Sequence, residues 1–160
     1  MIKQLIFFLI YITCLTSLAQ NTSLDKILEL KNKTNKENFL DTVLSLSYSE
    51  KTSNSQLFLE ISKQANLIAK QLKDTLKIAK THEDLALSYH LTNRFDLSIE
   101  STILAANYYY KIGEFAKYGD CYVNLGWRIN RRDLQKGIFY MQKGINILEY
   151  NMKEGISIII

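Results

Sequence analysis

The residues with the clearest chemical potential are His82 and Glu83, which occupy the first two positions of the zinc-binding pattern HExxH. In that pattern two histidines four residues apart on a helix ligate one metal, and the glutamate acts as general base. Here Ala86 stands in place of the second histidine, and His90 follows eight residues after His82. Eight helical residues span roughly 12 Å, too far for both histidines to ligate one metal. The sequence therefore predicts no metal site.

No other pattern in the chain predicts catalysis. Gly113, Gly119 and Gly126 are too far apart to form a phosphate-binding loop. No serine stands in a nucleophile-elbow context, and Cys121 has no evident histidine partner. We therefore expect neither enzymatic activity nor a cofactor. Because Cys121 stands among the apolar positions of a predicted helix, we expect a buried, inert thiol there.

The elements that position these residues are predicted to be helices of a single domain. The chain has 160 residues, of which 47% are hydrophobic, with no proline and only six glycines. This composition favours long helices joined by short turns over an all-β fold. The net charge is only +4, and no run of basic residues exceeds the pair Arg131-Arg132. We therefore expect no nucleic-acid partner.

The first 19 residues have the features of a secretory signal peptide. Lys3 precedes an apolar run over residues 5–15, and Ser17-Leu18-Ala19 supplies the small residues of a cleavage site. The run of about 11 residues is shorter than the roughly 20 that a membrane span needs. We expect cleavage between Ala19 and Gln20, export to the periplasm and no integral membrane segment in the mature chain. A retained membrane anchor and lipid attachment at Cys14 are the alternatives.

A period of forty residues organises the rest of the chain. Ala65, Ala105 and Ile145 are forty residues apart, and so are Leu72, Ile112 and Met152. A constant period of this size indicates stacked supersecondary units. After a polar entry with a short helix (residues 20–35), we expect three units and the start of a fourth, at 36–74, 75–114, 115–154 and 155–160. The expected helices cover residues 24–31, 36–50, 56–73, 76–92, 95–112, 115–130 and 133–151.

The helical pairs resemble tetratricopeptide repeats, whose signature places a Leu-Gly pair and an aromatic residue in the first helix and small residues in the second. The middle unit carries Leu85-Ala86, Tyr89, Phe95, Ser98 and Ala105, and the last carries Leu125-Gly126, Ile129, Leu134, Gly137 and Gly144. The signature tryptophan is replaced by His82 and Tyr122, and the closing proline is absent. The long units are similar to the exported repeat regions of bacterial sensor kinases and related regulators.

The resemblance implies an all-α fold, an α-solenoid of antiparallel helix pairs stacked in a right-handed superhelix. It implies that Ala86, Gly126, Ala105 and Gly144 allow close helix crossings. The large side chains of Tyr89, Phe95 and Leu134 are then expected to fill the gaps between pairs.

The resemblance also implies a concave face lined by the first helix of each unit. Trp127 is the most informative residue on this face, because tryptophan and arginine are enriched among binding hot spots and Arg131 follows one turn later. Contact with a partner and ordinary surface packing both remain open for Trp127. The expected concave positions are Lys80, Glu83, Leu87, His90, Asp120, Val123, Trp127, Asn130 and Arg131.

The function expected from these features is an exported scaffold that binds a peptide or protein partner through its concave face. The alternative is the N-terminal sensory region of a larger membrane-bound signalling regulator. The apolar residues Ile156, Ile158, Ile159 and Ile160 indicate a chain that is the front part of a longer protein, or alternatively self-association through the C-terminal end.

Overall fold

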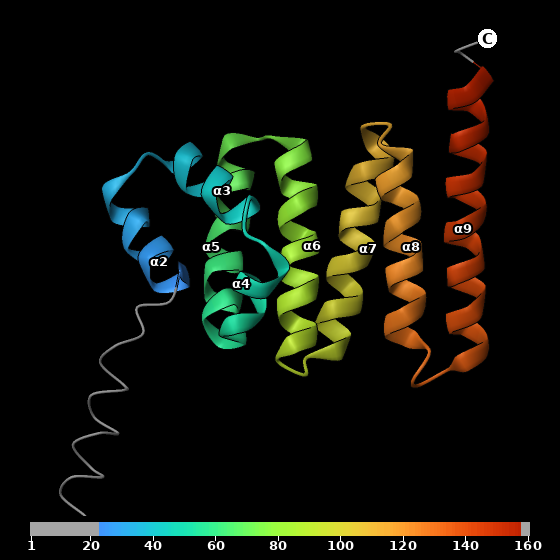
Figure 1. Cartoon of the computed structure of the whole chain (residues 1–160), viewed down its shortest axis with the longest axis horizontal. Coiled ribbons are helices and arrows are strands. Elements are labelled where there is room, and N and C mark those ends of the chain that lie inside the picture. The colour runs from blue at the N-terminus through green and yellow to red at the C-terminus, as the bar shows by residue number, and fades with distance from the viewer. Residues whose placement is uncertain (1–22, 158–160) are drawn as a thin grey trace, which may run out of the picture.

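The computed structural model describes residues 23–157, and this part of the chain is entirely helical (Figure 1). The predicted signal peptide, its cleavage site and residues 158–160 lie outside the described residues. Within the described residues, no helix combines the length and apolar character needed to cross a bilayer. The all-α class is confirmed. The helices are α2 (Ser23–Lys33), α3 (Lys36–Leu44), α4 (Tyr48–Ser53), α5 (Ser55–Leu72), α6 (Thr75–Leu91), α7 (Phe95–Lys111), α8 (Phe115–Ile129) and α9 (Leu134–Ser157).

The long helices α5 to α9 form a row in chain order and run alternately up and down (Figure 1). Each packs against the helix before it, and α5 to α8 also pack against the helix after them. The three short helices α2, α3 and α4 cover the N-terminal end of the row, mainly through contacts with α5. This arrangement leaves one side of α9 without a helical neighbour among the described residues, at the far end of the row from α2.

The forty-residue period is visible in the helix positions. α6 and α8 begin at Thr75 and Phe115, and Leu85 and Leu125 are each the eleventh residue of their helix. Both leucines are buried. The two leucines occupy equivalent positions because the apolar residues of α6 and α8 repeat with the same spacing. The same side of each helix is therefore buried.

Short turns separate the long helices and carry the expected turn chemistry. Asp74 begins α6 by accepting a hydrogen bond from the backbone N–H of Lys77 at 2.9 Å. Gly113 follows α7 with φ of +76°, a conformation that glycine adopts without steric cost. The first and last residues expected for α6, α7 and α8 each agree with the structure to within one residue.

The N-terminal core is built from large apolar side chains. Phe39, Leu40 and Val43 of α3 form one buried cluster with Phe58 and Ile61 of α5. Their spacing of three and four residues places them on one side of each helix. Close packing of these rings and aliphatic chains makes the end cap formed by α2, α3 and α5 a continuous hydrophobic core.

The pair α8 and α9 is packed through glycines instead. A Cβ atom added to Gly126 would lie 2.5 Å from the carbonyl oxygen of Gly137, and one added to Gly144 would lie 2.7 Å from the carbonyl oxygen of Gly119. Such distances are too short for any side chain, so the two helices approach until their backbones nearly touch. The expected close crossing at Gly126 and Gly144 is confirmed.

Two expectations about the first unit and the packing were wrong. The single helix expected over residues 36–50 is divided into α3 and α4, because Ser47 and Glu50 form a capping box that starts a new helix. Leu134 does not fill a gap between helix pairs. It is 60% exposed, since it lies in the first turn of α9, at the end of the row.

The C-terminal helix is longer than expected. α9 runs without a break to Ser157, past residue 154 where the third unit was expected to end. Any turn into a fourth unit therefore lies no earlier than residue 158, outside the described residues.

Candidate partner-binding groove

A cavity of about 300 Å³ opens between α4, α6, α7 and α8. Its wall is mostly polar, and it carries four charged side chains, two acidic ones from α6 and one basic one each from α4 and α8. We call this cavity the groove. It is lined by Lys51, Glu83, Asp84, Ala86, Leu87, Thr102, Ala105, Cys121, Asn124 and Arg128.

Asp84 is the most deeply buried charged group in the groove. It is 6% exposed, and its Oδ1 accepts from Nζ of Lys51 at 2.6 Å. Its Oδ2 is buried and has no hydrogen-bond partner. Burial raises the pKa of Asp84 to about 6, and the neighbouring ammonium of Lys51 only partly opposes this shift. The negative charge of Asp84 is therefore incompletely compensated.

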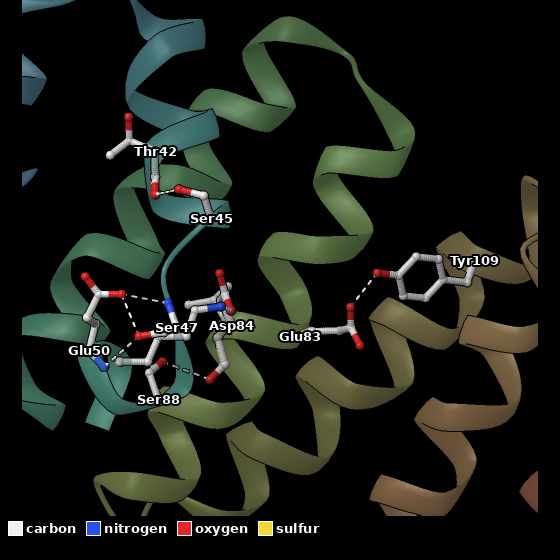
Figure 2. A network of polar contacts seen from close by, with 10 residues as sticks. Thr42, Ser45, Ser47, Glu50, Glu83, Asp84, Ser88 and Tyr109 are labelled. Atoms are coloured by element: carbon white, nitrogen blue, oxygen red, sulfur yellow. Dashed lines mark hydrogen bonds and ion pairs between the residues drawn. The ribbon is translucent and has the colours of Figure 1, made fainter. Parts of the chain in front are cut away.

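Glu83 points the other way, toward α7. Figure 2 shows its carboxylate accepting a hydrogen bond from the phenol of Tyr109, while Asp84 lies on the side of α6 that faces Ser47 and α4. Burial, together with the charge and hydrogen bond of Glu83, raises the pKa of Tyr109 far above its ordinary value. The phenol therefore remains a neutral donor, so this hydrogen bond gives Glu83 no ion-pair partner.

Arg128 connects the groove wall to the neighbouring helices. Its Nε donates to Oγ of Ser98 on α7 at 2.8 Å, and its Nη1 donates to the carbonyl oxygen of Asn124 at 3.2 Å. Ser98 in turn donates to the carbonyl oxygen of Ala86 on α6 at 2.6 Å. This relay joins α8, α7 and α6 and fixes the guanidinium in place through neutral partners.

Trp127 and His90 form an aromatic contact between α8 and α6. Their ring centroids are 4.9 Å apart, and His90 also meets Phe95 at 5.6 Å. Trp127 precedes the groove residue Arg128 and is 48% exposed. Burial, with the charges of Arg128 and Arg131, lowers the pKa of His90, so its imidazole is neutral near pH 7. The contact forms a flat, partly exposed aromatic surface.

Neither His82 nor Cys121 is arranged for catalysis. His82 is buried and stacks on Tyr108 at 5.7 Å, and burial, followed by the charge of Lys70, lowers its pKa to about 4. The Cys121 thiol is buried as expected, and burial raises its pKa to about 12, which keeps it protonated. Among residues 23–157, no three His, Cys, Asp or Glu side chains gather as metal ligands.

No protein-family model, curated protein or solved structure matches this chain. The groove must therefore be interpreted from its own residues. The resemblance to tetratricopeptide repeats remains a prediction based on the residues that carry it.

The structure brings together only part of the expected concave set. Glu83 and Leu87 line the groove, and His90 and Trp127 meet beside it. Val123 and Asn130 lie toward α9 instead, where Val123 packs against Gly144 and Asn130 packs against Gly137. The close glycine crossing brings α9 over this side of α8. Lys80 and Arg131 are exposed, and Asp120 pairs with Lys117 at 3.8 Å along the same helix.

Eight of the ten groove residues were not among the expected concave positions, and those with a charged or amide side chain are Lys51, Asp84, Asn124 and Arg128. Asp84 and Asn124 are forty residues apart, so the period itself could have indicated them as a shared polar column. No signal of that kind exists for Lys51. It reaches the groove only because the chain breaks before α4.

A second surface lies on the outer side of the last helix pair. It is an apolar cavity of about 810 Å³ between α8 and α9. Its lining includes Phe115 and Tyr118 of α8 and Phe139, Ile147 and Tyr150 of α9. Phe139 is 64% exposed, and Ile138, Ile145 and Met152 on α9 are also exposed. An apolar face of this extent is typical of an interaction surface.

Proposed function

We propose that this chain is a helical-repeat scaffold, of the tetratricopeptide type, that binds a peptide or protein segment along the groove and has no catalytic role. The observation that carries the proposal is the position of Trp127. Its half-exposed ring lies on His90 beside a cavity whose wall holds charged side chains from three helices. A large aromatic group next to buried polar groups is the usual composition of a binding hot spot.

A peptide fits this geometry better than a small apolar ligand. The groove wall is mostly polar, whereas cavities for drug-sized ligands are predominantly apolar. A peptide main chain carries both donors and acceptors, and the groove offers carboxylates, a guanidinium and the side chain of Asn124. The aromatic contact of Trp127 supplies the apolar part of the interaction.

Selection from random heptapeptides displayed on phage tests this proposal. We expect the wild-type chain to enrich a set of peptides, and Trp127→Ala and Arg131→Ala to reduce their capture about tenfold, the effect of losing one hot-spot side chain. Leu67→Ala is the matched control, because Leu67 is an exposed apolar residue on α5 outside the groove. Failure to enrich any peptide, or equal capture by all variants, would contradict the proposal.

We also propose that the chain acts in the periplasm after removal of residues 1–19. Lys3, the short apolar run and the small residues before Gln20 support this proposal. Mass spectrometry of the protein recovered from a periplasmic fraction should give a chain that begins at Gln20. A chain that begins at Met1 would contradict cleavage. A sensory role within a larger regulator is compatible with the same groove and the same location.

The outer face of α9 supports a second candidate function, self-association. Its exposed aromatic and aliphatic side chains would be removed from water if two copies of this face packed together. The two candidates use surfaces that share no lining residue. Variants in one surface should therefore leave the other function unchanged.

A further inference from the structure

The groove contains one buried acceptor atom that the protein itself does not use. Oδ1 of Asp84 is bonded to Lys51, but Oδ2 has no donor although the residue is 6% exposed. A buried carboxylate oxygen without a protein donor is destabilising, because burial removes it from bulk solvent and no hydrogen bond within the protein offsets that cost. A donor that enters the groove from a ligand would remove this penalty.

The charges around Asp84 indicate what kind of donor suits the site. Glu83, the next residue, bonds the neutral phenol of Tyr109, and its charge disfavours the ionised form of Asp84. Arg128 bonds a hydroxyl and a backbone carbonyl rather than a carboxylate. Lys51 is therefore the only ion-pair partner of Asp84 among the described residues, and burial outweighs its effect.

On the basis of the proposed function, we infer that the groove receives a lysine side chain of the bound peptide, whose ammonium donates to Oδ2 of Asp84. An ammonium supplies both the missing hydrogen bond and a positive charge, whereas an amide N–H supplies the bond alone. A guanidinium donates best as a fork to both oxygens of a carboxylate. Since Lys51 already occupies Oδ1, a single-point donor fits better than a fork.

The test uses blocked alanine pentapeptides with lysine, arginine, acetyl-lysine, norleucine or glutamate at the centre. Each is titrated into the full chain, and binding is followed by NMR shifts of the groove amides and of the Trp127 indole. We expect the lysine peptide to bind about tenfold more tightly than the norleucine peptide, the effect of one charge-assisted hydrogen bond. Acetyl-lysine, which keeps the N–H but not the charge, and arginine should both bind less tightly than lysine, and glutamate should bind least.

Asp84→Asn keeps the shape of the side chain and removes its charge. In this variant the lysine peptide should bind no more tightly than the norleucine peptide, and binding of norleucine should not change. Glu83→Gln is the second variant, and it should reduce the lysine preference by a smaller factor. In the wild-type chain, ¹³C NMR should show that the lysine peptide lowers the pKa of Asp84.

The outcomes separate this inference from the proposed function. If all five peptides shift the Trp127 indole with equal affinity, the peptide-binding proposal stands and the lysine site is wrong. Tightest binding of the glutamate peptide, or an unchanged pKa of Asp84 in the presence of the lysine peptide, also overturns the lysine site. If no peptide shifts any groove resonance, both proposals are wrong.

Discussion

At the N-terminal end of the helix row, α5 is covered by α3 through phenylalanine, leucine and valine side chains, whereas at the C-terminal end α8 meets α9 backbone to backbone through glycines. The first region gains stability from the volume of its side chains, and the second from the closeness of its helices. The two regions should therefore respond to opposite kinds of substitution. Removing atoms should damage the first, and adding them should damage the second.

The largest expected effect is the loss of a core ring in the N-terminal region. Phe58 is fully buried in the cluster that joins α3 and α5. Phe58→Ala should lower the free energy of unfolding by about 3–5 kcal/mol, because it removes buried apolar surface and leaves a cavity. Urea unfolding followed by circular dichroism measures this effect. Leu72→Ala, at the last residue of the same helix where the side chain is 41% exposed, should change the stability by about 1 kcal/mol at most.

The second prediction concerns the pH dependence of stability. The pKa of Asp84 is raised in the folded chain, so folding favours its protonated form. Its contribution to the free energy of unfolding is therefore fully present below pH 4 and is lost as the pH rises through about 6. The pKa of His82 is lowered to about 4, so its contribution is present above pH 6.5 and is lost as the pH falls through 4. Each shift of roughly two units corresponds to about 3 kcal/mol, and the two nearly cancel between pH 4 and pH 6.5.

Asp84→Asn removes one of these opposing contributions. The stability of this variant should therefore rise by about 3 kcal/mol from pH 4 to pH 6.5, while that of the wild-type chain stays almost level. Urea unfolding at half-unit steps of pH gives both profiles. Parallel profiles would show that the carboxylate of Asp84 is not under-compensated in the folded protein.

The third prediction concerns the C-terminal region. Gly126→Ala would place a methyl group 2.5 Å from the carbonyl oxygen of Gly137, which belongs to the backbone and cannot turn away. The helices must separate, and the free energy of unfolding should fall by about 1–3 kcal/mol although alanine is the better helix former. Urea unfolding measures the change. The control is Ala116→Gly, an exposed position in the first turn of the same helix, where the loss should be at most about 1 kcal/mol and reflect helix propensity alone.

The smallest effect on stability is expected on the outer face of α9. Phe139→Ser should change the free energy of unfolding by less than about 0.5 kcal/mol, because the ring is already mostly in water. If the face mediates self-association, the same substitution should convert dimers to monomers in light scattering coupled to size exclusion. Trp127→Ala should leave the oligomeric state unchanged, because Trp127 contacts His90 and does not line the apolar surface of α8 and α9. A wild-type chain that is monomeric at all concentrations would exclude self-association through this face.

The regular helices could be predicted from the sequence, whereas the break in the first unit could not. The helices from α6 to α8 follow the forty-residue period closely, because the spacing of Leu85 and Leu125 repeats one packing pattern. The break between α3 and α4 was missed because apolar residues continue from Phe39 to Leu46 across it. The capping pair Ser47 and Glu50 was present in the sequence as the only sign of a new helix.

The groove could be predicted only in part. Glu83 and Leu87 were expected on the inner face because the tetratricopeptide resemblance places them there, and both line the groove. Val123 and Asn130 were misplaced because the sequence does not show how closely glycines bring α9 onto α8. Lys51 and Arg128 were missed because their partners, Asp84 and Ser98, lie about thirty residues away in the chain. Such pairs depend on the tertiary arrangement and not on local periodicity.

Trp127 is the only tryptophan in the chain, and it lies against His90. The intrinsic fluorescence of the protein excited at the red edge of the indole band therefore comes from a single site beside the groove. Protonation of the adjacent imidazole should quench this emission, so an acid titration of fluorescence would report the ionisation of His90 without any label. A protein with tryptophans distributed over its core would not permit so local an optical measurement.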